Sequence, residues 1–402
     1  MLIYCREKKT SYRCPRDGRP YIVLQTSSIG KIALMTTTLD TGISNARNVN
    51  RYLFGSGTIG QLTTLLSERR KKKEKQVVYL VDEYFETNSS ALGMLSPESN
   101  DQLIYISTRD EPTTQSIDQL TETITGSSGK EICAVVGIGG GITLDTAKAV
   151  SNLLTNGGSA SDYQGWDLVR IPGVFKIGVP TLSGTGAEAT RTCVMTNKDT
   201  DLKLGMNSDH TVFNQLILDP DLTATVPRDQ YFFTGMDAWI HCVEALNGTY
   251  RNSIGDAFSN QAIALCRSVF DGEDMMSDES RGKLMVASYL GGCAIATSYV
   301  GVVHPFSAGL SVVLDLHHCV ANCIVMMAME PYYPKEYGEF RTFIDRNEIV
   351  LPRDVCQGLS DAQFDALYRA TIVHEKPLTN ALGTRFSSEM TKTRVRELFE
   401  QM

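Results

Sequence analysis

The feature that most constrains the fold is a change of pattern near Val226 and Pro227. From about Arg51 to Leu218, short β-branched runs alternate with segments whose apolar residues recur every three or four positions. Beyond Pro227, long segments rich in Ala, Met and Leu keep the helical spacing, with hardly a strand-like run. Alternating strands and helices favour a parallel sheet covered by helices, whereas the second half should be all-helical.

Four β-rich runs are the predicted strands, namely Val77–Val81, Gln102–Ile106, Cys133–Gly137 and Lys176–Pro180. We therefore expect an α/β domain with a parallel sheet over residues 49–225 and an all-α domain over residues 226–402. Residues 1–48 have no clear period and should form an appendage that is poorly ordered. Met35 could equally be the first residue of the protein.

The composition argues against several classes of protein. Apolar residues make up 42% of the 402 positions and charged residues 21%, which is typical of a soluble globular protein. The net charge of -8 argues against non-specific binding to nucleic acid. No apolar stretch approaches the roughly 20 residues that cross a bilayer. The ten cysteines are scattered, so we expect reduced thiols in the cytoplasm. Cys319 and Cys323 are interpreted as small core residues rather than metal ligands.

Asp237 and His241 lie four residues apart in a segment with helical apolar spacing. This spacing puts both side chains on one face of a helix, about one turn apart. His304 and the adjacent pair His317 and His318 follow later in the chain. A carboxylate with several imidazoles suits a divalent metal such as zinc or ferrous iron. The alternative for Asp237 and His241 is a buried polar pair that satisfies itself.

A glycine-rich turn follows the third predicted strand and opens a helix, with Gly139, Gly140, Gly141, Asp145 and Lys148 in order. Glycines let the backbone approach a pyrophosphate closely, and the amides at the start of a helix attract the anion. A tight turn without any ligand is the alternative for such a motif standing alone. We predict a dinucleotide site here because two further segments support it.

The first supporting residue is Asp82 at the end of the first predicted strand, where a carboxylate can bond the ribose hydroxyls of NAD. Asp82 as a helix cap is the alternative. The second is a loop after the fourth strand that contains Thr181 and Thr185 among glycines. Hydroxyls and glycines in such a loop suit contacts with phosphate and ribose, so both threonines are predicted cofactor contacts.

Six motifs in order resemble those of the iron-dependent (group III) alcohol dehydrogenases: Phe54 to Gly57, Gly139 to Lys148, Pro180 to Glu188, Asp219 to Thr223, Gly235 to His241 and His304 to His318. The resemblance covers residues 51–333. It implies a dinucleotide-binding α/β domain, an all-α domain, and a metal in the cleft between them. It also implies oxidation of an alcohol with NAD as hydride acceptor.

Carried across residue by residue, the resemblance implies the metal ligands Asp237, His241, His304 and His318, which are also the predicted catalytic residues. His318 is preferred because the family spaces this ligand fourteen residues after His304. His317 occupies a position that is usually proline in the family, and it is interpreted as an imidazole outside the ligand set.

The chain departs from the family pattern at two positions. Ile142 replaces the serine usual after the three glycines, which leaves phosphate contacts to backbone amides. Ala308 replaces a histidine usual four residues after the ligand His304. A pocket altered at this second position indicates a substrate unlike the small alcohols of other members.

One branch of the family is more similar in two segments, Leu314 to Cys323 and His374 to Leu382. These resemble the 3-deoxy-D-manno-octulosonate (Kdo) 8-oxidases. That resemblance implies oxidation of the C8 hydroxyl of Kdo to an aldehyde, which a pyridoxal-phosphate aminotransferase converts to 8-amino-Kdo for lipopolysaccharide. An acidic sugar needs a cationic partner, and the candidates are Lys203, Arg191, Lys376 and Arg385.

Several alternatives stay open at this point. The substrate could be another polyol or small alcohol, and the metal iron or zinc. Dehydroquinate synthase, a lyase, shares the two-domain layout, so a lyase is the second functional alternative. His374 is interpreted as a packed or solvated residue rather than a proton relay. We also expect a homodimer, because helical domains with exposed apolar faces commonly pair.

Overall fold

The computed structural model describes residues 10–13, 20–23, 47–70, 75–88, 92–93, 95–127 and 129–402. The chain divides into two units, residues 1–37 and 38–402. In the first unit, β1 (Thr10–Arg13) and β2 (Pro20–Val23) pair as an antiparallel hairpin. Most of the predicted appendage, residues 1–48, lies outside the described residues. The prediction that it is poorly ordered concerns those residues and is therefore not tested.

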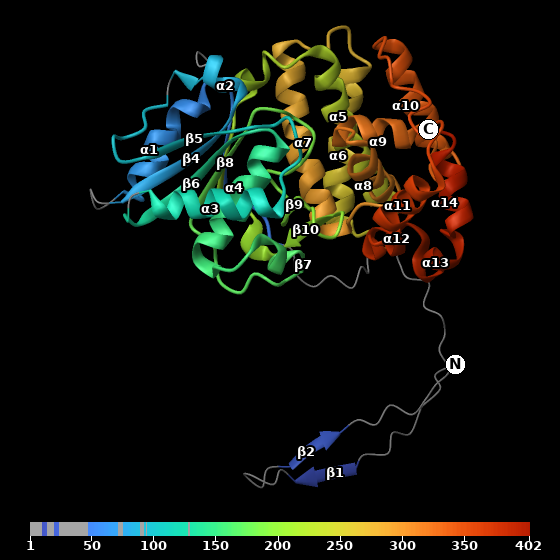
Figure 1. Cartoon of the computed structure of the whole chain (residues 1–402), viewed down its shortest axis with the longest axis horizontal. Coiled ribbons are helices and arrows are strands. Elements are labelled where there is room, and N and C mark those ends of the chain that lie inside the picture. Colours follow the sequence, from blue (N-terminus) through green and yellow to red (C-terminus); the bar gives the residue numbers. More distant parts are fainter. Residues whose placement is uncertain are drawn as a thin grey trace, which may run out of the picture. The chain divides into compact units, whose positions relative to one another are not determined.

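A six-stranded sheet forms the core of the first half of the second unit (Figure 1). In spatial order its strands are β3 (Arg51–Phe54), β11 (Gln215–Leu218), β8 (Lys176–Pro180), β6 (Ile132–Gly139), β4 (Gln76–Asp82) and β5 (Gln102–Ile106). Every neighbouring pair is parallel. The parallel sheet and its four predicted strands are confirmed, and β3 and β11 complete it.

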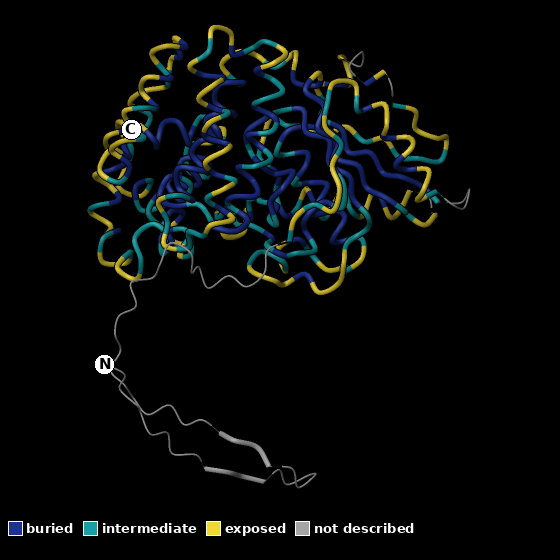
Figure 2. Tube along the Cα trace, turned by 180° about the vertical axis from the view of Figure 1, so that it is seen from behind, coloured by how far each residue is buried: buried dark blue, intermediate teal, exposed yellow. Residues whose placement is uncertain are grey.

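Helices cover both faces of this sheet because the inner strands are apolar on both sides. Val78 and Leu80 of β4 pack against α3 (Thr114–Gly126) and α4 (Gly141–Asn156). Val77 and Val81 face the opposite way, toward α1 (Leu62–Ser67) and α2 (Tyr84–Thr87). Figure 2 shows these central strands as the buried interior of this half.

A second, smaller sheet was not predicted from the sequence. It consists of β7 (Gly165–Trp166), β10 (Leu202–Asn207) and β9 (Thr192–Asn197). β10 pairs parallel with β7 and antiparallel with β9. These strands are short or carry Thr, Lys and Asn, so their composition resembles that of a loop.

Helices alone form the second half of the chain, as predicted. They are α5 (Arg228–Asn247), α6 (Ser253–Phe270), α7 (Asp278–Ser298), α8 (Val303–Leu314), α9 (His318–Met326), α10 (Pro334–Arg346), α11 (Asp361–Ile372), α12 (Glu375–Leu382), α13 (Phe386–Glu389) and α14 (Lys392–Phe399). They enclose one large apolar core. Because residues 38–402 form one unit, the domain boundary at 225/226 stays a prediction.

Among the described residues, no helix is by itself long and apolar enough to cross a membrane. Helices α7 and α8 pass that criterion only when taken together, and they are bent by 106°. The eight cysteines in the described part of the chain are all free thiols.

Candidate metal and nucleotide site

One cavity of about 970 Å³ is lined by residues of the α/β half and of the helical half. Among the residues singled out from the sequence, it is lined by Asp82, Gly140, Gly141, Asp145, Thr181, Thr185, His241, His304 and His318. Six of the eight predicted nucleotide contacts and three of the four predicted metal ligands therefore face a common space, which the sequence alone could not establish.

Helix α5 supplies the first two predicted ligands. Asp237 and His241 are buried one helical turn apart, and His241 Nε2 lies 3.4 Å from Asp237 Oδ1. The helix approaches its neighbours closely at Gly235, where a Cβ atom would lie 2.5 Å from the Phe270 ring. The predicted one-face arrangement is therefore present on a buried helix.

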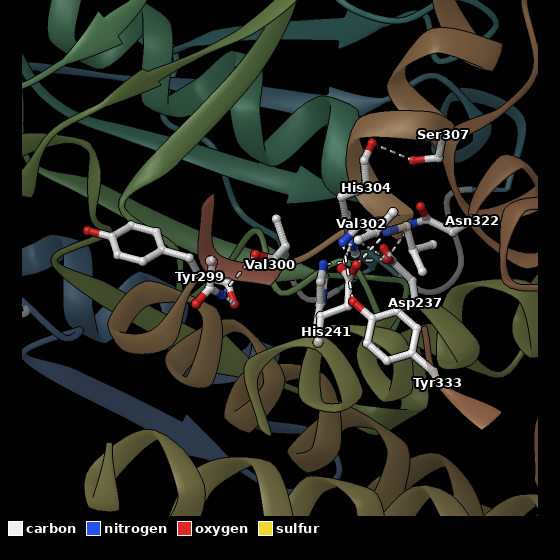
Figure 3. Close-up of polar contacts among 12 residues, drawn as sticks. Asp237, His241, Tyr299, Val300, Val302, His304, Ser307, Asn322 and Tyr333 are labelled. Carbon is white, nitrogen blue, oxygen red and sulfur yellow. Dashed lines mark hydrogen bonds and ion pairs between the residues drawn. The ribbon is translucent and has the colours of Figure 1, made fainter. Parts of the chain in front are cut away.

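Helices α8 and α9 bring the other two predicted ligands, His304 and His318, to the same point. Figure 3 shows His304 beside Asp237 and His241. His304 Nε2 lies 3.3 Å from Asp237 Oδ1, and His318 Nε2 lies 3.9 Å from Asp237 Oδ2. Candidate ligand atoms of Asp237, His304 and His318 all lie within 4.8 Å of one another. The His241 ring stacks on that of His304 with centroids 4.6 Å apart, so all four side chains are brought together.

Glu244 is a member of this cluster that the sequence analysis missed. It lies on α5 one turn beyond His241, and its carboxylate contacts His304 Nδ1. The backbone amide of Val303 donates to Glu244 Oε1 at 2.5 Å. A proton held on Nδ1 leaves the Nε2 lone pair of His304 pointing to Asp237. The spacing of three residues from His241 could have identified Glu244.

Asn322 is the second residue that was missed. Its side-chain Nδ2 lies 2.7 Å from Asp237 Oδ1, 3.2 Å from His318 Nε2 and 3.4 Å from His304 Nε2. It follows His318 by four residues on α9, so the same one-turn spacing that linked Asp237 to His241 could have found it. Asn322 holds the carboxylate of Asp237 by donating a hydrogen bond to it.

The charges of the cluster depend on burial and mutual contact. Burial would raise the pKa of Asp237, but the three imidazoles hold it well below its ordinary value. Burial lowers the pKa of His241 to about 4 and that of His318 to about 3. Burial also opposes the charged form of His304, but Glu244 and Asp237 raise its pKa to about 9.

These residues fit a divalent cation. Imidazole nitrogens and carboxylate oxygens are its ordinary ligands, and those of Asp237, His304 and His318 converge here. In the described part of the chain, no Lys or Arg forms an ion pair with Asp237. The assignment of Asp237, His241, His304 and His318 as ligands stays a prediction that this geometry favours.

The glycine turn lies where β6 ends and α4 begins, and its glycines allow close packing. A Cβ atom on Gly140 would lie 2.7 Å from the Leu182 side chain, and one on Gly141 would lie 3.2 Å from Thr185. Gly140 and Gly141 line the cavity, whereas Gly139 is the last residue of β6 and does not. The close approach to the loop after β8 explains why this turn needs glycine.

Asp82 lies at the carboxyl end of β4 and lines the cavity. Its Oδ1 accepts hydrogen bonds from the Tyr84 amide at 3.0 Å and from the Thr108 hydroxyl at 3.4 Å. Burial raises its pKa. Asp82 therefore makes the local contact expected of a cap and also lines the cavity where the ribose contact was predicted.

Lys148 is placed differently from the sequence prediction. It is fully buried, does not line the cavity, and its ammonium donates to the Thr192 carbonyl at 2.6 Å and to the Thr190 hydroxyl at 3.1 Å. It also lies 3.3 Å from Asp145, which accepts from the Val194 amide at 2.9 Å. Lys148 therefore ties α4 to the segment at the start of β9.

His317, His374 and the altered position Ala308 also line the cavity. His317 is exposed, caps α9 and is not part of the group formed by Asp237, His304 and His318. His374 was interpreted as packed or solvated, and its Nε2 atom is buried without a hydrogen-bond partner. Burial lowers the pKa of His374 to about 4.

Three of the four candidate cations line the cavity, and Arg385 does not. Lys203 pairs with Glu111 at 2.8 Å. Arg191 forms ion pairs with two aspartates, Asp167 and Asp209. Arg385 pairs with Glu389 at the surface. The ammonium of Lys376 instead lies over two aromatic rings, those of Trp166 and Tyr299.

Comparison with solved structures shows the same fold. A 1,3-propanediol oxidoreductase superposes with a TM-score of 0.76 at 20% identity, covering 89% of this chain and 99% of that one. Sulfoacetaldehyde reductase from Bifidobacterium kashiwanohense, solved in complex with NAD+, has a TM-score of 0.73 at 20% identity, covering 88% and 98%. At this identity the likeness concerns the fold alone.

Among curated relatives, alcohol dehydrogenase 4 of Schizosaccharomyces pombe is 30% identical over 60% of this chain and 57% of its own length. NAD-dependent methanol dehydrogenase of Bacillus methanolicus is 34% identical over 48% of this chain and 51% of its own. The chain thus spans a little over half the length of these relatives. Family models match residues 49–220 (iron-containing alcohol dehydrogenase) and 232–345 (Fe-containing alcohol dehydrogenase family, C-terminal). The chain therefore belongs to the iron-containing alcohol dehydrogenase family.

Proposed function

We propose that this protein is a metal-dependent oxidoreductase that converts a primary alcohol to an aldehyde with NAD as hydride acceptor. The observation that carries the proposal is the single cavity lined by the glycine turn of α4 and by three imidazoles beside Asp237. A nucleotide on the turn and an alcohol beside the imidazoles would therefore share one space, as hydride transfer requires.

The chain's own residues have separable roles in this proposal. A divalent ion bound by Asp237, His241, His304 and His318 would act as a Lewis acid toward the alcohol oxygen. Glu244 keeps His304 in the tautomer that offers Nε2. The start of α4 offers backbone amides to the nucleotide phosphates. The nitrogen and oxygen donors suit both ferrous iron and zinc, and the family name supports iron.

The substrate is the less determined part of the proposal, because relatives are named for different alcohols. They include methanol dehydrogenase of Bacillus methanolicus, choline dehydrogenase of Bacillus subtilis and 1,3-propanediol dehydrogenase of Citrobacter freundii. We propose the C8 hydroxyl of Kdo, on the route to 8-amino-Kdo, as the finer hypothesis. Lys376 supports an acidic sugar, because it lines the cavity with its ammonium over aromatic rings, whereas the other cavity cations Lys203 and Arg191 are paired with acids. Another polyol or small alcohol is the alternative.

The lyase alternative is less well supported. Both matched family models describe alcohol dehydrogenases, and together they extend over the glycine turn and all four predicted ligands. A reaction of the dehydroquinate-synthase type would leave no net NADH, whereas the proposed reaction accumulates it.

The test is turnover of the full chain loaded with zinc or ferrous iron, with NAD and either Kdo or 1,3-propanediol. NADH, peroxide and aldehyde are followed together. We expect NADH and aldehyde in equal amounts, whereas peroxide would indicate an oxidase. Turnover of the diol without turnover of Kdo would reject the Kdo hypothesis alone. Absence of NADH with either alcohol would count against the general proposal.

Two hypotheses about partners accompany this proposal. The aldehyde of an acidic sugar is a substrate for a pyridoxal-phosphate aminotransferase, so we propose functional coupling to such an enzyme in the cytoplasm. We also propose that the chain forms a homodimer. Light scattering of the purified protein tests the dimer, and a monomer at micromolar concentration would reject it.

A further inference from the structure

We propose that Lys376 and His374, at the start of α12, form a subsite for an anionic group of the substrate. The preferred substrates would then be hydroxy acids, in which a carboxylate is held by this subsite and a primary hydroxyl reaches the metal ligands. The inference rests on the proposed function and deepens it, because it assigns the charge class of the substrate to two residues of this chain.

The first observation is the environment of Lys376. Its Nζ lies 3.9 Å from the ring centre of Trp166 and 4.1 Å from that of Tyr299, and all three residues line the cavity. Aromatic faces attract an ammonium but do not neutralise its charge. In the described part of the chain, Lys376 forms no ion pair, whereas Lys203 and Arg191 are both paired with acids. Lys376 therefore offers its charge to a ligand.

The second observation is the conformation of Tyr299. This residue ends α7 with φ +59°, in the left-handed region that a residue with a side chain rarely adopts. Its amide donates to the Ile295 carbonyl at 3.0 Å, and its ring meets those of Trp166 and Tyr250 edge-on at 5.6 and 5.5 Å. Backbone strain of this kind clusters at ligand sites. The conformation of Tyr299 places its aromatic ring beneath the ammonium of Lys376.

The third observation is the unsatisfied nitrogen of His374. Its Nε2 is buried without a partner, and the residue lines the cavity two positions before Lys376. A buried polar atom of this kind calls for a hydrogen-bond partner, which a ligand in the cavity can supply. The lowered pKa of His374 means that the imidazole is neutral near pH 7. A neutral ring adjusts its tautomer and can donate to a carboxylate oxygen.

The location of the subsite favours the substrate over the nucleotide. Helix α12 contacts α8, the helix that carries His304. The turn at Gly140 and Gly141, where we expect the phosphates, belongs to the other half of the chain. The rings that could surround a cationic alcohol are occupied by the ammonium of Lys376. A cationic substrate is therefore disfavoured and an anion attracted.

The experiment compares matched ligands on the metal-loaded full chain. Each pair has one hydroxyl in common and differs in its other end: 4-hydroxybutanoate with 1,4-butanediol, and 6-hydroxyhexanoate with 1,6-hexanediol. Calorimetry without NAD gives the Kd of each ligand and needs no turnover. We expect one hydroxy acid at least to bind about 10-fold more tightly than its diol, as a charge-assisted contact provides.

Variants then assign the preference to the subsite. Lys376→Met keeps most of the unbranched side chain without its charge and should reduce the acid-to-diol preference by about 10-fold or more, whereas Lys376→Arg should retain most of it. His374→Phe should reduce it by a smaller factor. Lys392→Met is the matched control, because Lys392 pairs with Asp365 on the surface and does not line the cavity. It should leave the preference unchanged.

Three outcomes would overturn the inference. Acid and diol could bind equally to the unmodified protein. Lys376→Met could weaken the binding of acid and diol equally. In a separate calorimetric titration with NAD, the same variant could weaken the binding of NAD alone. Failure of the proposed function is a different result, in which no alcohol yields NADH while the hydroxy acid still binds more tightly than its diol. NADH formed from diols without any preference for acids would reject the subsite and leave the oxidoreductase intact.

Discussion

At the scale of single residues, the cluster around Asp237 depends on side chains that do not point at the expected metal position. Glu244 contacts the far side of the His304 ring and also accepts from the Val303 backbone. Asn322 donates to Asp237. Such contacts fix the direction of the candidate ligand atoms in the folded chain, so the entropy cost of ordering them would be met during folding rather than on binding an ion.

We predict that Glu244→Gln weakens metal binding by about 10- to 100-fold, because His304 loses the partner that fixes its ring. The pKa of His304 in the metal-free protein should fall from about 9 toward 6.5. Because the pKa of His304 is raised by folding, its protonation stabilises the fold fully below pH 6.5, and this stability is lost as the pH rises through about 9. The variant should therefore show a smaller change of stability between these pH values. Metal titration and histidine NMR measure both effects. Glu279→Gln, in a surface pair with Lys283, is the control.

His374 predicts a pH dependence of the opposite sign. Its pKa is lowered to about 4 from 6.5, so it favours the fold above pH 6.5 and this stability is lost as the pH falls toward 4. Between pH 7 and 5 the loss in the unmodified protein should exceed that in His374→Gln by up to about 2 kcal/mol. Urea unfolding at both pH values measures the difference, and equal losses would contradict the burial of a neutral ring.

At the scale of elements, the loop between β8 and β9 connects the glycine turn at the start of α4 to helix α5. Thr181 and Thr185 of this loop line the cavity beside Gly141, and Gly184 touches the backbone of α5. A Cβ atom on Gly184, where φ is +155°, would lie 1.6 Å from the Thr234 carbonyl oxygen. This contact sets how close the loop lies to the helix that carries Asp237.

We predict that Gly184→Ala destabilises the protein by more than about 3 kcal/mol, because the added methyl meets rigid backbone at a φ that alanine avoids. Metal affinity should fall with it, since α5 must shift. Gly338→Ala is the matched control, because Gly338 lies in α10 with open space around it. That change should stabilise the helix by about 0.5 to 1 kcal/mol. Chemical denaturation checks both, and a neutral Gly184→Ala would refute the close contact.

At the scale of the whole molecule, the cavity joins the α/β half to the helical half, so ligands on either wall act on one unit. The sheet presents the carboxyl ends of β4, β6 and β8 to this space, where open parallel sheets usually bind ligands. The helical half contributes imidazoles from three helices, α5, α8 and α9. Neither half supplies both the nucleotide turn and the imidazoles.

We predict that metal and NAD each stabilise the folded chain, with NAD at 100 times its Kd adding about 2.7 kcal/mol to the free energy of unfolding. His304→Ala should lose the metal effect and retain the NAD effect, because His304 belongs to the helical half. His317→Ala should retain both, since His317 is outside the ligand group. Thermal unfolding with each ligand measures this. Full metal stabilisation in His304→Ala would contradict the predicted ligand set.

Much of this architecture could be predicted because it depends on local pattern. The apolar runs of β4, β6 and β8 are buried by any fold that covers a parallel sheet, so the existence of these strands follows from composition. β5, at the edge of the sheet, is half-buried, and its alternating apolar residues identified it. The second sheet escaped prediction because its polar strands are stabilised by pairing with one another across the chain. The intrinsic β-propensity of the residues in these strands does not predict which distant segments pair.

The sequence by itself determined the α/β half, the helical half, the one-turn spacing of Asp237 and His241, and the family to which the motifs belong. Only the tertiary structure decided that Glu244 and Asn322 contact the predicted ligands, that Lys148 is buried and bonds to the segment at the start of β9, and that Lys376 lies over Trp166. The physical reason is the separation along the chain of the residues that interact. Periodicity reports contacts within a few residues, whereas burial, ion pairing and cavities arise between residues far apart in the chain.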